Sequence, residues 1–491
     1  MRSIPVFVVL LAVGLLTSAA FGQGWTGQQM VNRPNGDEFD AMPTVAADRA
    51  GRPWVVWATN YGDTTLLWTR WLGSGWEPQR GVSRDAPGVA FRVRPDLAFD
   101  EQDRTWLVWD NGYENNNSDI AACYWDGSQW TSELLVNLFD STDLDFAPKV
   151  ACGGGQVWCV WYGGPTSSSP YSVYASRWSD YLGAWEPEMQ VSPADGNHHW
   201  WCDVAVDTLG MPHVVWLTAP LNVVFYSHFD GLEWVSPIPV NDGVRTMASS
   251  WANPRIVIDS TGTMHVCFTG AKVGAMHSDI FYSHNDGSGW IACQMVTRDG
   301  LYDEWYSDIA ADRSDNVWVT WDRENEGPDR FRVHASHFDG QLWSSEQRLD
   351  TDSAHYDDCP AVCLDSSGCP VVLWNGIPYS ATNFDVFFNR FGRTGIAEAK
   401  PAPLAGVTRL RCATLQNSSG LTASFTLNAA AQVRIVLYDE VGRCKAVLAD
   451  GHMPKGAHTV RCSQFLAPGA YLCRLEAEGQ SEVSKVILLG H

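Results

Sequence analysis

The segment "PTVAADRAGRPWVVW", residues 43–57, recurs along this 491-residue chain and decides its expected fold. It joins two short apolar runs through a polar turn, and the second run ends in an aromatic residue. Six further copies begin at Pro95, Pro148, Cys202, Pro254, Ser307 and Pro360. An even period near 53 residues indicates a repeat architecture in which each copy forms one supersecondary unit.

Each copy predicts a β-hairpin, because Val-, Ile- and Trp-rich runs flank a polar turn. The turn is Asp-x-x-Gly in four copies: Asp48–Gly51, Asp207–Gly210, Asp259–Gly262 and Asp365–Gly368. In the first copy, the Asp48 side chain can accept backbone N–H groups of the turn, and Gly51 can adopt a positive φ. We therefore predict a structural role for these aspartates. The tryptophans that recur at fixed places in the copies are expected in the core.

A second hairpin follows each copy and carries a Trp with Val or Leu six positions later. Six such pairs occur: Trp76/Val82, Trp130/Val136, Trp185/Val191, Trp234/Val240, Trp290/Val296 and Trp343/Leu349. The seventh repeat lacks the pair, and residues 24–31, "GWTGQQMV", supply Trp25 and Val31 at the same offset. β-propellers remove their open edges by closing the first strand on the last sheet. We predict an all-β fold, a seven-bladed β-propeller over residues 23–395 that is closed by an N-terminal strand.

Three stretches, "SHNDGSGW" (residues 283–290), "SHFDGLEW" (227–234) and "SHFDGQLW" (336–343), contain Ser, Asp, Gly and Trp in that order. They resemble the Asp-box of bacterial sialidases and other BNR-repeat propellers, which implies a propeller fold. The Arg-Ile-Pro motif of sialidases is missing here, because Pro43 follows Asp-Ala-Met. Strand direction places the Asp-box-like and Asp-x-x-Gly turns on one face. The longer loops of the opposite face, called the loop face, are therefore expected to carry function.

One ring of loop-face residues lies three positions before each repeat: Asp40, Arg92, Asp145, His199, Trp251, Glu304 and Asp357. Indole faces stack on sugar rings, and carboxylates accept hydrogen bonds from sugar hydroxyls. The pattern predicts a site for an extracellular glycan or protein. The expected ligand-binding residues are Asp40, Arg92, Asp145, Trp200, Trp201, Trp251, Trp305 and Tyr306. The alternative is that the aromatics only cap the ring and the acids are solvated.

Catalysis is a second hypothesis for the same face, beside the preferred one of binding alone. Neighbouring carboxylates would suit a glycoside hydrolase, with Glu304, Asp357, His199 and Tyr356 as catalytic residues. A polysaccharide lyase would use a histidine or Tyr356 as base and Arg92 to neutralise a uronate. Calcium is a rival for the acids of "DSTDLD", residues 140–145. No other cofactor is expected.

Composition and charge narrow the partners and the compartment. Residues 1–22 contain Arg2, the apolar run "VFVVLLAVGLL" and small residues, the pattern of a signal peptide, which predicts a secreted or outer-surface protein. No later segment is apolar enough to suggest a transmembrane anchor. The formal charge of −23 disfavours nucleic acid. The cysteines of the apolar runs, Cys123, Cys152, Cys159, Cys267 and Cys363, are expected to be buried, and no spacing suggests zinc.

A change in composition marks a second domain. Residues 396–406 form a linker rich in Pro and Ala, and residues 407–491 contain no Trp. From Ile396 the chain carries ten Lys or Arg against seven Asp or Glu. Alternating apolar and polar residues predict a small Ig-like β-sandwich. Its stretches "VLYDEVGR", "GAHTV" and "LAPGAYLCRL" resemble the C-terminal sorting domain of type IX secretion cargo and its flagellar hook-capping relatives. The resemblance implies an export machinery as partner.

Overall fold

The computed structural model describes most of the chain from Gln23 to Leu488, and every described element is a strand. The described residues are 23–32, 39–59, 66–73, 75–82, 89–113, 117–137, 144–166, 170–241, 244–246, 253–272, 274–297, 301–313, 315–324, 331–350, 356–377, 383–393, 407–414, 421–427, 430–439, 444–462, 469–477 and 480–488. The predicted signal peptide and linker lie outside them. The all-β class is confirmed, and within these ranges no helix of membrane-spanning length and hydropathy occurs.

The chain divides into two compact units, unit 1 (Met1–Gly395) and unit 2 (Ile396–His491). The strands of unit 1 pair in six sheets, one of which contains nine strands and spans the second and third repeats. We divide these strands into groups numbered in the order of the seven sequence repeats. Group 1 contains β3 (Asp40–Ala47), β4 (Pro53–Thr59), β5 (Leu66–Arg70) and β6 (Arg80–Gly81). Group 2 contains β7 (Val89–Phe99), β8 (Thr105–Tyr113), β9 (Ser118–Trp125) and β10 (Leu134–Leu135). Group 3 contains β11 (Leu144–Gly153), β12 (Gln156–Gly164), β13 (Ser172–Ser179), β14 (Ala184–Trp185) and β15 (Met189–Gln190).

The remaining groups repeat the same antiparallel order. Group 4 contains β16 (His198–Val206), β17 (Pro212–Ala219), β18 (Val223–His228) and β19 (Ile238–Pro239). Group 5 contains β20 (Val244–Thr246), β21 (Arg255–Ile258), β22 (Met264–Lys272), β23 (Asp279–Asn285) and β24 (Gln294–Met295). Group 6 contains β25 (Glu304–Arg313), β26 (Asn316–Glu324), β27 (Phe331–Phe338) and β28 (Gln347–Arg348). Group 7 contains β29 (Tyr356–Leu364), β30 (Pro370–Ile377) and β31 (Asp385–Arg393), with β1 (Gln23–Trp25) and β2 (Gln29–Met30).

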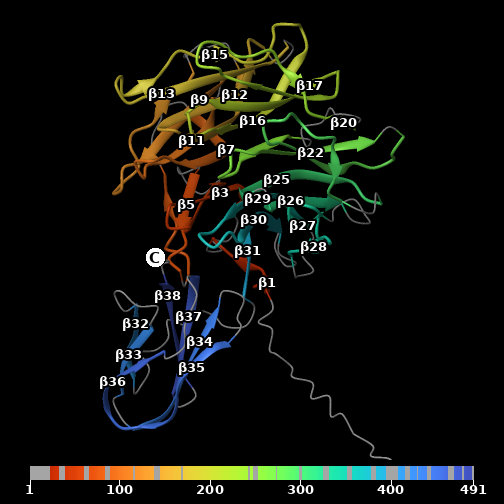
Figure 1. Ribbon diagram of the computed structural model, residues 1–491. Coiled ribbons are helices and arrows are strands. Elements are labelled where there is room, and N and C mark those ends of the chain that lie inside the picture. The colour runs from red at the N-terminus through yellow and green to blue at the C-terminus, as the bar shows by residue number, and fades with distance from the viewer. Residues whose placement is uncertain are drawn as a thin grey trace, which may run out of the picture. The chain divides into compact units, whose positions relative to one another are not determined.

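The first strands of the groups form a closed ring, as in a β-propeller. In chain order β3, β7, β11, β16, β21, β25 and β29 each contact the next, and β29 contacts β3. The labels of β7, β11, β16 and β25 lie toward the middle of unit 1, whereas those of β13, β15 and β28 lie at its periphery (Figure 1). The first residues of unit 1 close the last group, because Trp25 pairs with Phe391 and Gln29 with Phe388. The seam between head and tail of unit 1 is therefore one continuous sheet.

The turns opposite the loop face are built as the sequence predicts. Asp48 Oδ1 accepts hydrogen bonds from the backbone N–H groups of Ala50 and Arg52, each at 2.9 Å. In the Asp-box-like turn of group 4, Asp230 Oδ1 accepts the N–H groups of Leu232 and Glu233 at 2.8 and 2.9 Å. Each carboxylate accepts hydrogen bonds from backbone N–H groups of its own turn, which confirms the structural role of these aspartates.

The core lies between facing sheets and contains the periodic tryptophans. The indoles of Trp57, Trp109, Trp161, Trp216, Trp321 and Trp374 are fully buried. Of the five cysteines expected in the core, Cys123, Cys159, Cys267 and Cys363 are buried and Cys152 is partly buried. These thiols fill space between strands as small apolar groups.

A belt of alternating charge runs along five successive first strands, one residue after the repeat start. It consists of Asp96, Lys149, Asp203, Arg255 and Asp308 on five successive first strands. Lys149 Nζ lies 2.9 Å from Asp96 Oδ1. The three aspartates each accept a backbone N–H of the next group, from Val150, Ile256 and Val362, at 2.8 Å. The belt therefore joins neighbouring groups through both charge and hydrogen bonds.

Unit 2 contains two antiparallel sheets that share one core. One sheet consists of β32 (Val407–Thr414), β33 (Leu421–Leu427) and β36 (Gly456–Arg461). The other consists of β35 (Cys444–Met453), β34 (Ala431–Asp439), β37 (Gly469–Ala477) and β38 (Gln480–Leu488). Phe425 of the first sheet and Ile435 and Leu475 of the second are buried in the same cluster.

Candidate functional site

Four residues of the predicted loop-face ring hold core tryptophans. In each case, the indole Nε1 of the Trp that ends the second apolar run donates to them. The pairs are Trp57 to Asp40 (3.0 Å), Trp161 to Asp145 (3.0 Å), Trp216 to His199 (3.1 Å) and Trp374 to Asp357 (2.9 Å). The acceptor side chains are at most 7 % exposed. A glycine opposite Asp145 and another opposite Asp357, Gly163 and Gly376, leave room for the carboxylates.

Glu304 and Arg92 are also buried in ion pairs. Arg323 Nε donates to Glu304 Oε1 at 2.6 Å, and Arg92 lies 3.3 Å from Glu133. The predicted catalytic acids Glu304 and Asp357 and the predicted base His199 are thus packed in the core instead of lining an open site. The physical reason is that a buried N–H or charge needs a partner, and these side chains supply it. Trp251 lies outside the described residues.

A recurring β-bulge interrupts the first strand of six groups directly before the repeat start. Its residues have positive φ: Met42 (55°), Arg94 (50°), Ala147 (50°), Trp201 (50°), Tyr306 (45°) and Cys359 (52°). The pairing register with the second strand shifts at each bulge. Positive φ is unfavourable for L-residues, so the bulge is imposed by the fold. It presents the two residues before the repeat start at the loop-face end of the ring.

The bulges bring an ionisable set together at the ring axis. We call Arg94, Asp110, Tyr306, Asp322, Tyr356 and Asp358 the axial cluster. Arg94 belongs to group 2 and interacts electrostatically with Tyr306 of group 6, across the ring. Arg94 Nε donates to Asp110 Oδ2 at 2.7 Å. Of the predicted site residues, Tyr306 and Tyr356 belong to this cluster, and both are partly exposed.

The carboxyl groups of the axial cluster hold protons unusually well. Burial raises the pKa of Asp358 to about 7, although Asn375 and Tyr356 donate hydrogen bonds to it. Burial and then the charge of Asp358 raise the pKa of Asp322 well above its usual value. Burial also raises the pKa of Tyr306 and of Tyr356, which therefore stay protonated. A carboxyl group that titrates near neutral pH can accept or donate a proton in the physiological range.

An aromatic group adjoins the axial cluster on groups 3 and 4. We call Phe146, Tyr162, Tyr171, His198, Trp200 and Trp201 the aromatic wall. The Arg94 guanidinium lies 5.5 Å from the Phe146 ring centre, and Trp201 lies 5.5 Å from Tyr162. Trp200 and Trp201 are partly exposed, and among the described residues their Nε1 atoms have no hydrogen-bond acceptor. The predicted Trp305 is also partly exposed and precedes Tyr306.

The sequence matches no protein-family model. No curated protein matches it either. Among solved structures, a protein of unknown function from Dyadobacter fermentans has a TM-score of 0.49 and 9 % identity over 76 % of this chain and 99 % of its own. Penicillium chrysogenum α-L-arabinanase complexed with arabinobiose has a TM-score of 0.45 and 12 % identity over 75 % of this chain and 98 % of its own. Trypanosoma rangeli sialidase in complex with the inhibitor DANA has a TM-score of 0.40 and 13 % identity over 83 % of this chain and 85 % of its own.

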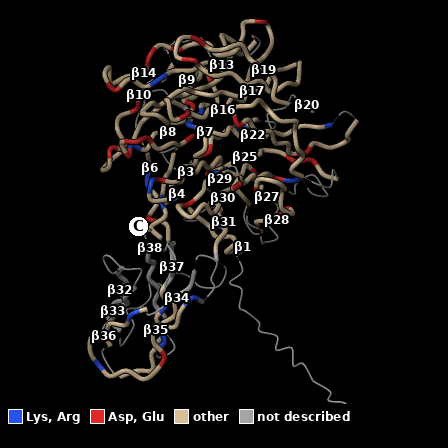
Figure 2. The backbone as a smooth tube through the Cα atoms, in the orientation of Figure 1, with Lys and Arg blue, Asp and Glu red and all other residues tan. Residues whose placement is uncertain are grey.

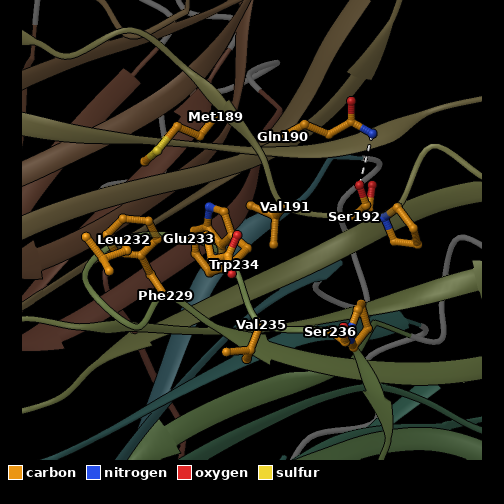
Figure 3. A pocket seen from close by; sticks show the side chains of 12 residues that line it. Met189, Gln190, Val191, Ser192, Phe229, Leu232, Glu233, Trp234, Val235 and Ser236 are labelled. Atoms are coloured by element: carbon orange, nitrogen blue, oxygen red, sulfur yellow. Dashed lines mark hydrogen bonds between the residues drawn. The ribbon is translucent and has the colours of Figure 1, made fainter.

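A separate hollow of about 460 Å³ lies at the outer strands of groups 3 and 4, away from the bulges. Met189 and Val191 line one side, and Phe229, Leu232 and Trp234 line the other (Figure 3). Glu233 is its one acidic lining residue, and it is exposed. Gln190, Ser192 and Ser236 supply its other polar side chains, and no basic residue of the described ranges lines it.

The described ranges contain no cluster of side chains that could bind calcium or another metal. Asp140 and Asp143 of the proposed calcium stretch lie outside them, and the oxygens of Asp145 accept hydrogen bonds from Trp161 and Asn137. No group of three potential metal-ligating side chains occurs among the described residues. Acidic residues are instead distributed over the strands and turns of unit 1 (Figure 2).

Sequence reasoning missed Arg94, Asp110, Asp322 and Asp358. The signal was present, because these residues lie one or two positions before a repeat start or directly after the Trp that ends the second run. Asp358 follows the predicted Asp357. The axial cluster therefore lies at the predicted loop-face end of the ring, one or two residues from the predicted positions.

Proposed function

We propose that unit 1 is a seven-bladed β-propeller that binds an extracellular glycan at the axial cluster and aromatic wall. The observation that carries the proposal is the meeting of partly exposed indoles with Arg94, Tyr356 and Asp358 at one end of the ring. Aromatic faces suit the C–H faces of sugars, and the polar groups suit hydroxyls. Aromatic side chains with a few convergent polar groups are the usual lining of a small-ligand site.

The aromatic wall and the axial cluster would divide the work of recognition. Trp200 and Trp201 would stack on sugar rings through the exposed parts of their indoles. Asp358, Tyr356 and Tyr306 would orient the hydroxyls of the next unit. Arg94 is already paired with Asp110, so a carboxylated sugar would have to compete with that ion pair. Neutral sugar units therefore fit the described part of the site better than acidic ones.

The proposal includes the location of the protein. The signal peptide expected in residues 1–22 would export the chain, and unit 2 would act as a sorting domain for the export machinery. Its shared core of two sheets suits a small sandwich of that kind. The functional protein would then be secreted or attached to the outer cell surface. Expression of the chain with and without residues 396–491, followed by fractionation, tests this: release that does not depend on unit 2 contradicts it.

Catalysis is the second candidate, and the Asp358 carboxyl favours it. A group with a pKa of about 7 beside a protonated Tyr356 and a second carboxyl group can exchange protons with a glycosidic oxygen or a sugar C–H. Hydrolysis and elimination both need such a group. The enzyme would then be a glycoside hydrolase or a polysaccharide lyase that uses Asp358 where the sequence pointed to Glu304.

A glycan array and a polysaccharide-degradation screen on unit 1 separate the two candidates. Binding without product supports a binding protein, and product that disappears in Asp358→Asn and Tyr356→Phe supports an enzyme. Trp200→Ala and Trp201→Ala should each weaken binding at least about tenfold, equal to about 1.4 kcal/mol. Tyr181→Ala is the control, because Tyr181 is 96 % exposed on a turn of the opposite face. Unchanged binding in both Trp variants would exclude this site.

A further inference from the structure

Three groups use one repeat position in the same way. Asp110, Asp322 and Asn375 each follow the Trp that ends the second run, and each accepts the backbone N–H of a bulge residue in the next group. The bonds are Ala147 N to Asp110 Oδ1 (3.0 Å), Cys359 N to Asp322 Oδ2 (3.1 Å) and Met42 N to Asn375 Oδ1 (3.4 Å). The position therefore holds the bulges that shape the axial cluster.

The second polar atom of this side chain distinguishes the three groups. In group 2, Asp110 Oδ2 accepts hydrogen bonds from Arg94 of its own group. In group 7, Asn375 Nδ2 donates to Asp358 of its own group. In group 6, Asp322 Oδ1 has no hydrogen-bond partner among the described residues, although Asp322 is 0 % exposed. Asp322 is thus a buried carboxyl group that lacks the cation which balances Asp110.

We propose that Asp322 is the positioning residue of the axial cluster: it holds the Cys359 bulge, and its carboxyl group acts with that of Asp358 as one coupled pair that retains a proton. The proposal rests on the proposed function only in treating Asp358 as the ligand-facing acid. Cys359 directly follows Asp358, so the bond from Asp322 to its N–H fixes the backbone beside that acid. A buried carboxyl group and a partly buried one beside it, without a cation, cannot both ionise cheaply. Protons then leave the pair in two separated steps.

The groups around the pair do not supply the missing charge. The titratable or polar neighbours that interact with Asp322 or Asp358 are Tyr306 on β25, Glu324 on β26, Tyr356 and Cys359 on β29, and Asn375 on β30. Arg255 on β21 acts on Cys359 but is paired with Asp308. Arg94, the cation of the axial cluster, acts on Tyr306 but is paired with Asp110. Among the described residues, the groups that interact directly with Asp322 or Asp358 are therefore neutral or acidic at neutral pH.

Infrared spectroscopy of the full chain without glycan tests the pair, because protonated carboxyl groups have their own C=O stretch. Asp322→Asn should fold, since the chain itself uses Asn375 at this position to accept a bulge N–H. The spectrum of the double variant Asp322→Asn/Asp358→Asn is the baseline. Subtracting it removes the infrared signal of the other buried carboxyl groups. Relative to it, the native pair should titrate in two steps at least about one pH unit apart. Each single variant should titrate in one step, below the upper native step.

The outcome that overturns the proposal is additivity. If the native curve equals the sum of the two single-variant curves, the carboxyl groups are independent and Asp322 is only structural. If Asp322→Asn does not fold, the titration curve of Asp358→Asn can be subtracted from that of the native protein, and this difference curve still tests the coupling. A single one-proton curve contradicts coupling, and a two-wave difference supports it. Because no glycan is used, failure here leaves the array result intact, and a failed array leaves the coupling intact.

Discussion

At the residue scale, the same residue type has opposite roles at neighbouring positions. Asp357 is buried and holds the indole of Trp374, whereas Asp358 is partly exposed and belongs to the axial cluster. The two residues are neighbours in regular strand pairing, opposite Gly376 and Asn375, so their side chains point to opposite faces of the sheet. Structural and functional acids of this protein can therefore be told apart by substitution.

Removal of an indole acceptor should reduce stability and leave ligand binding intact. Asp145→Ala leaves Trp161 Nε1 buried without a partner, which is expected to cost about 1–3 kcal/mol of unfolding free energy. Asp145→Asn keeps an acceptor oxygen and should lose less. Urea unfolding and the glycan array measure the two effects. A large loss of affinity in a stably folded Asp145→Ala protein would return this residue to the binding site.

Asp358→Asn should act in the reverse way. We expect little change in the urea midpoint, because the side chain is partly exposed, and a loss of any pH dependence of binding or turnover near pH 7. In the native protein, Asp358 is protonated below about pH 7 and ionised above it. An affinity profile measured from pH 5 to pH 9 checks this. A native profile that is flat across pH 7 would show that Asp358 does not face the ligand.

At the element scale, the bulged first strand explains why the axial cluster lies one to two residues from the predicted ring. The repeat period fixed the strand pairs and the loop-face end, because apolar and aromatic residues recur evenly. The bulge adds an unpaired residue and so reverses which side chains point inward after it. Met, Ala and Trp do not favour a positive φ, so the residue types of Met42, Ala147 and Trp201 do not predict the bulge. The core and the ring were therefore readable, and the axial cluster was not.

The strain of the bulge should be measurable in Ala147→Gly. Ala147 has φ near 50°, which costs an L-residue about 1–2 kcal/mol and costs glycine little. We expect a gain of up to about 1 kcal/mol in unfolding free energy after the entropy cost of glycine. Ala151→Gly in the same strand, where φ is not positive, should lose about as much. Equal losses in both variants would show that the bulge carries no strain.

The charge belt should make stability depend on pH through Asp203. Burial, opposed by Arg255 and Lys149, raises the pKa of Asp203 to about 6. Between its usual pKa and 6, the folded state binds more protons than the unfolded state, so this contribution to stability falls as pH rises through 6. The full effect is at most about 3 kcal/mol. Comparison of native protein and Asp203→Asn by urea unfolding at pH 4.5 and pH 8 should show a smaller pH effect in the variant.

At the scale of the whole molecule, unit 1 depends on contacts between residues far apart in the chain. Trp25 packs against Trp318 and Phe391, and its Nε1 donates to Gln347 at 2.6 Å. Trp25→Ala should therefore cost at least about 2 kcal/mol, and it should promote association through the freed edge of β31. Leu72→Ala, at an exposed turn residue, is the control. Calorimetry and light scattering report the two effects, and a variant as stable and monomeric as the control would contradict the seam.

The closure of β1 on β31 also sets a condition on biosynthesis. The strand made first can be placed only after Arg393 has been made, so a chain that terminates inside any repeat has two unpaired ends instead of a seam. Partial products then expose backbone donors and acceptors that proteases and chaperones recognise. The ring can therefore close only in a chain that contains the complete last repeat.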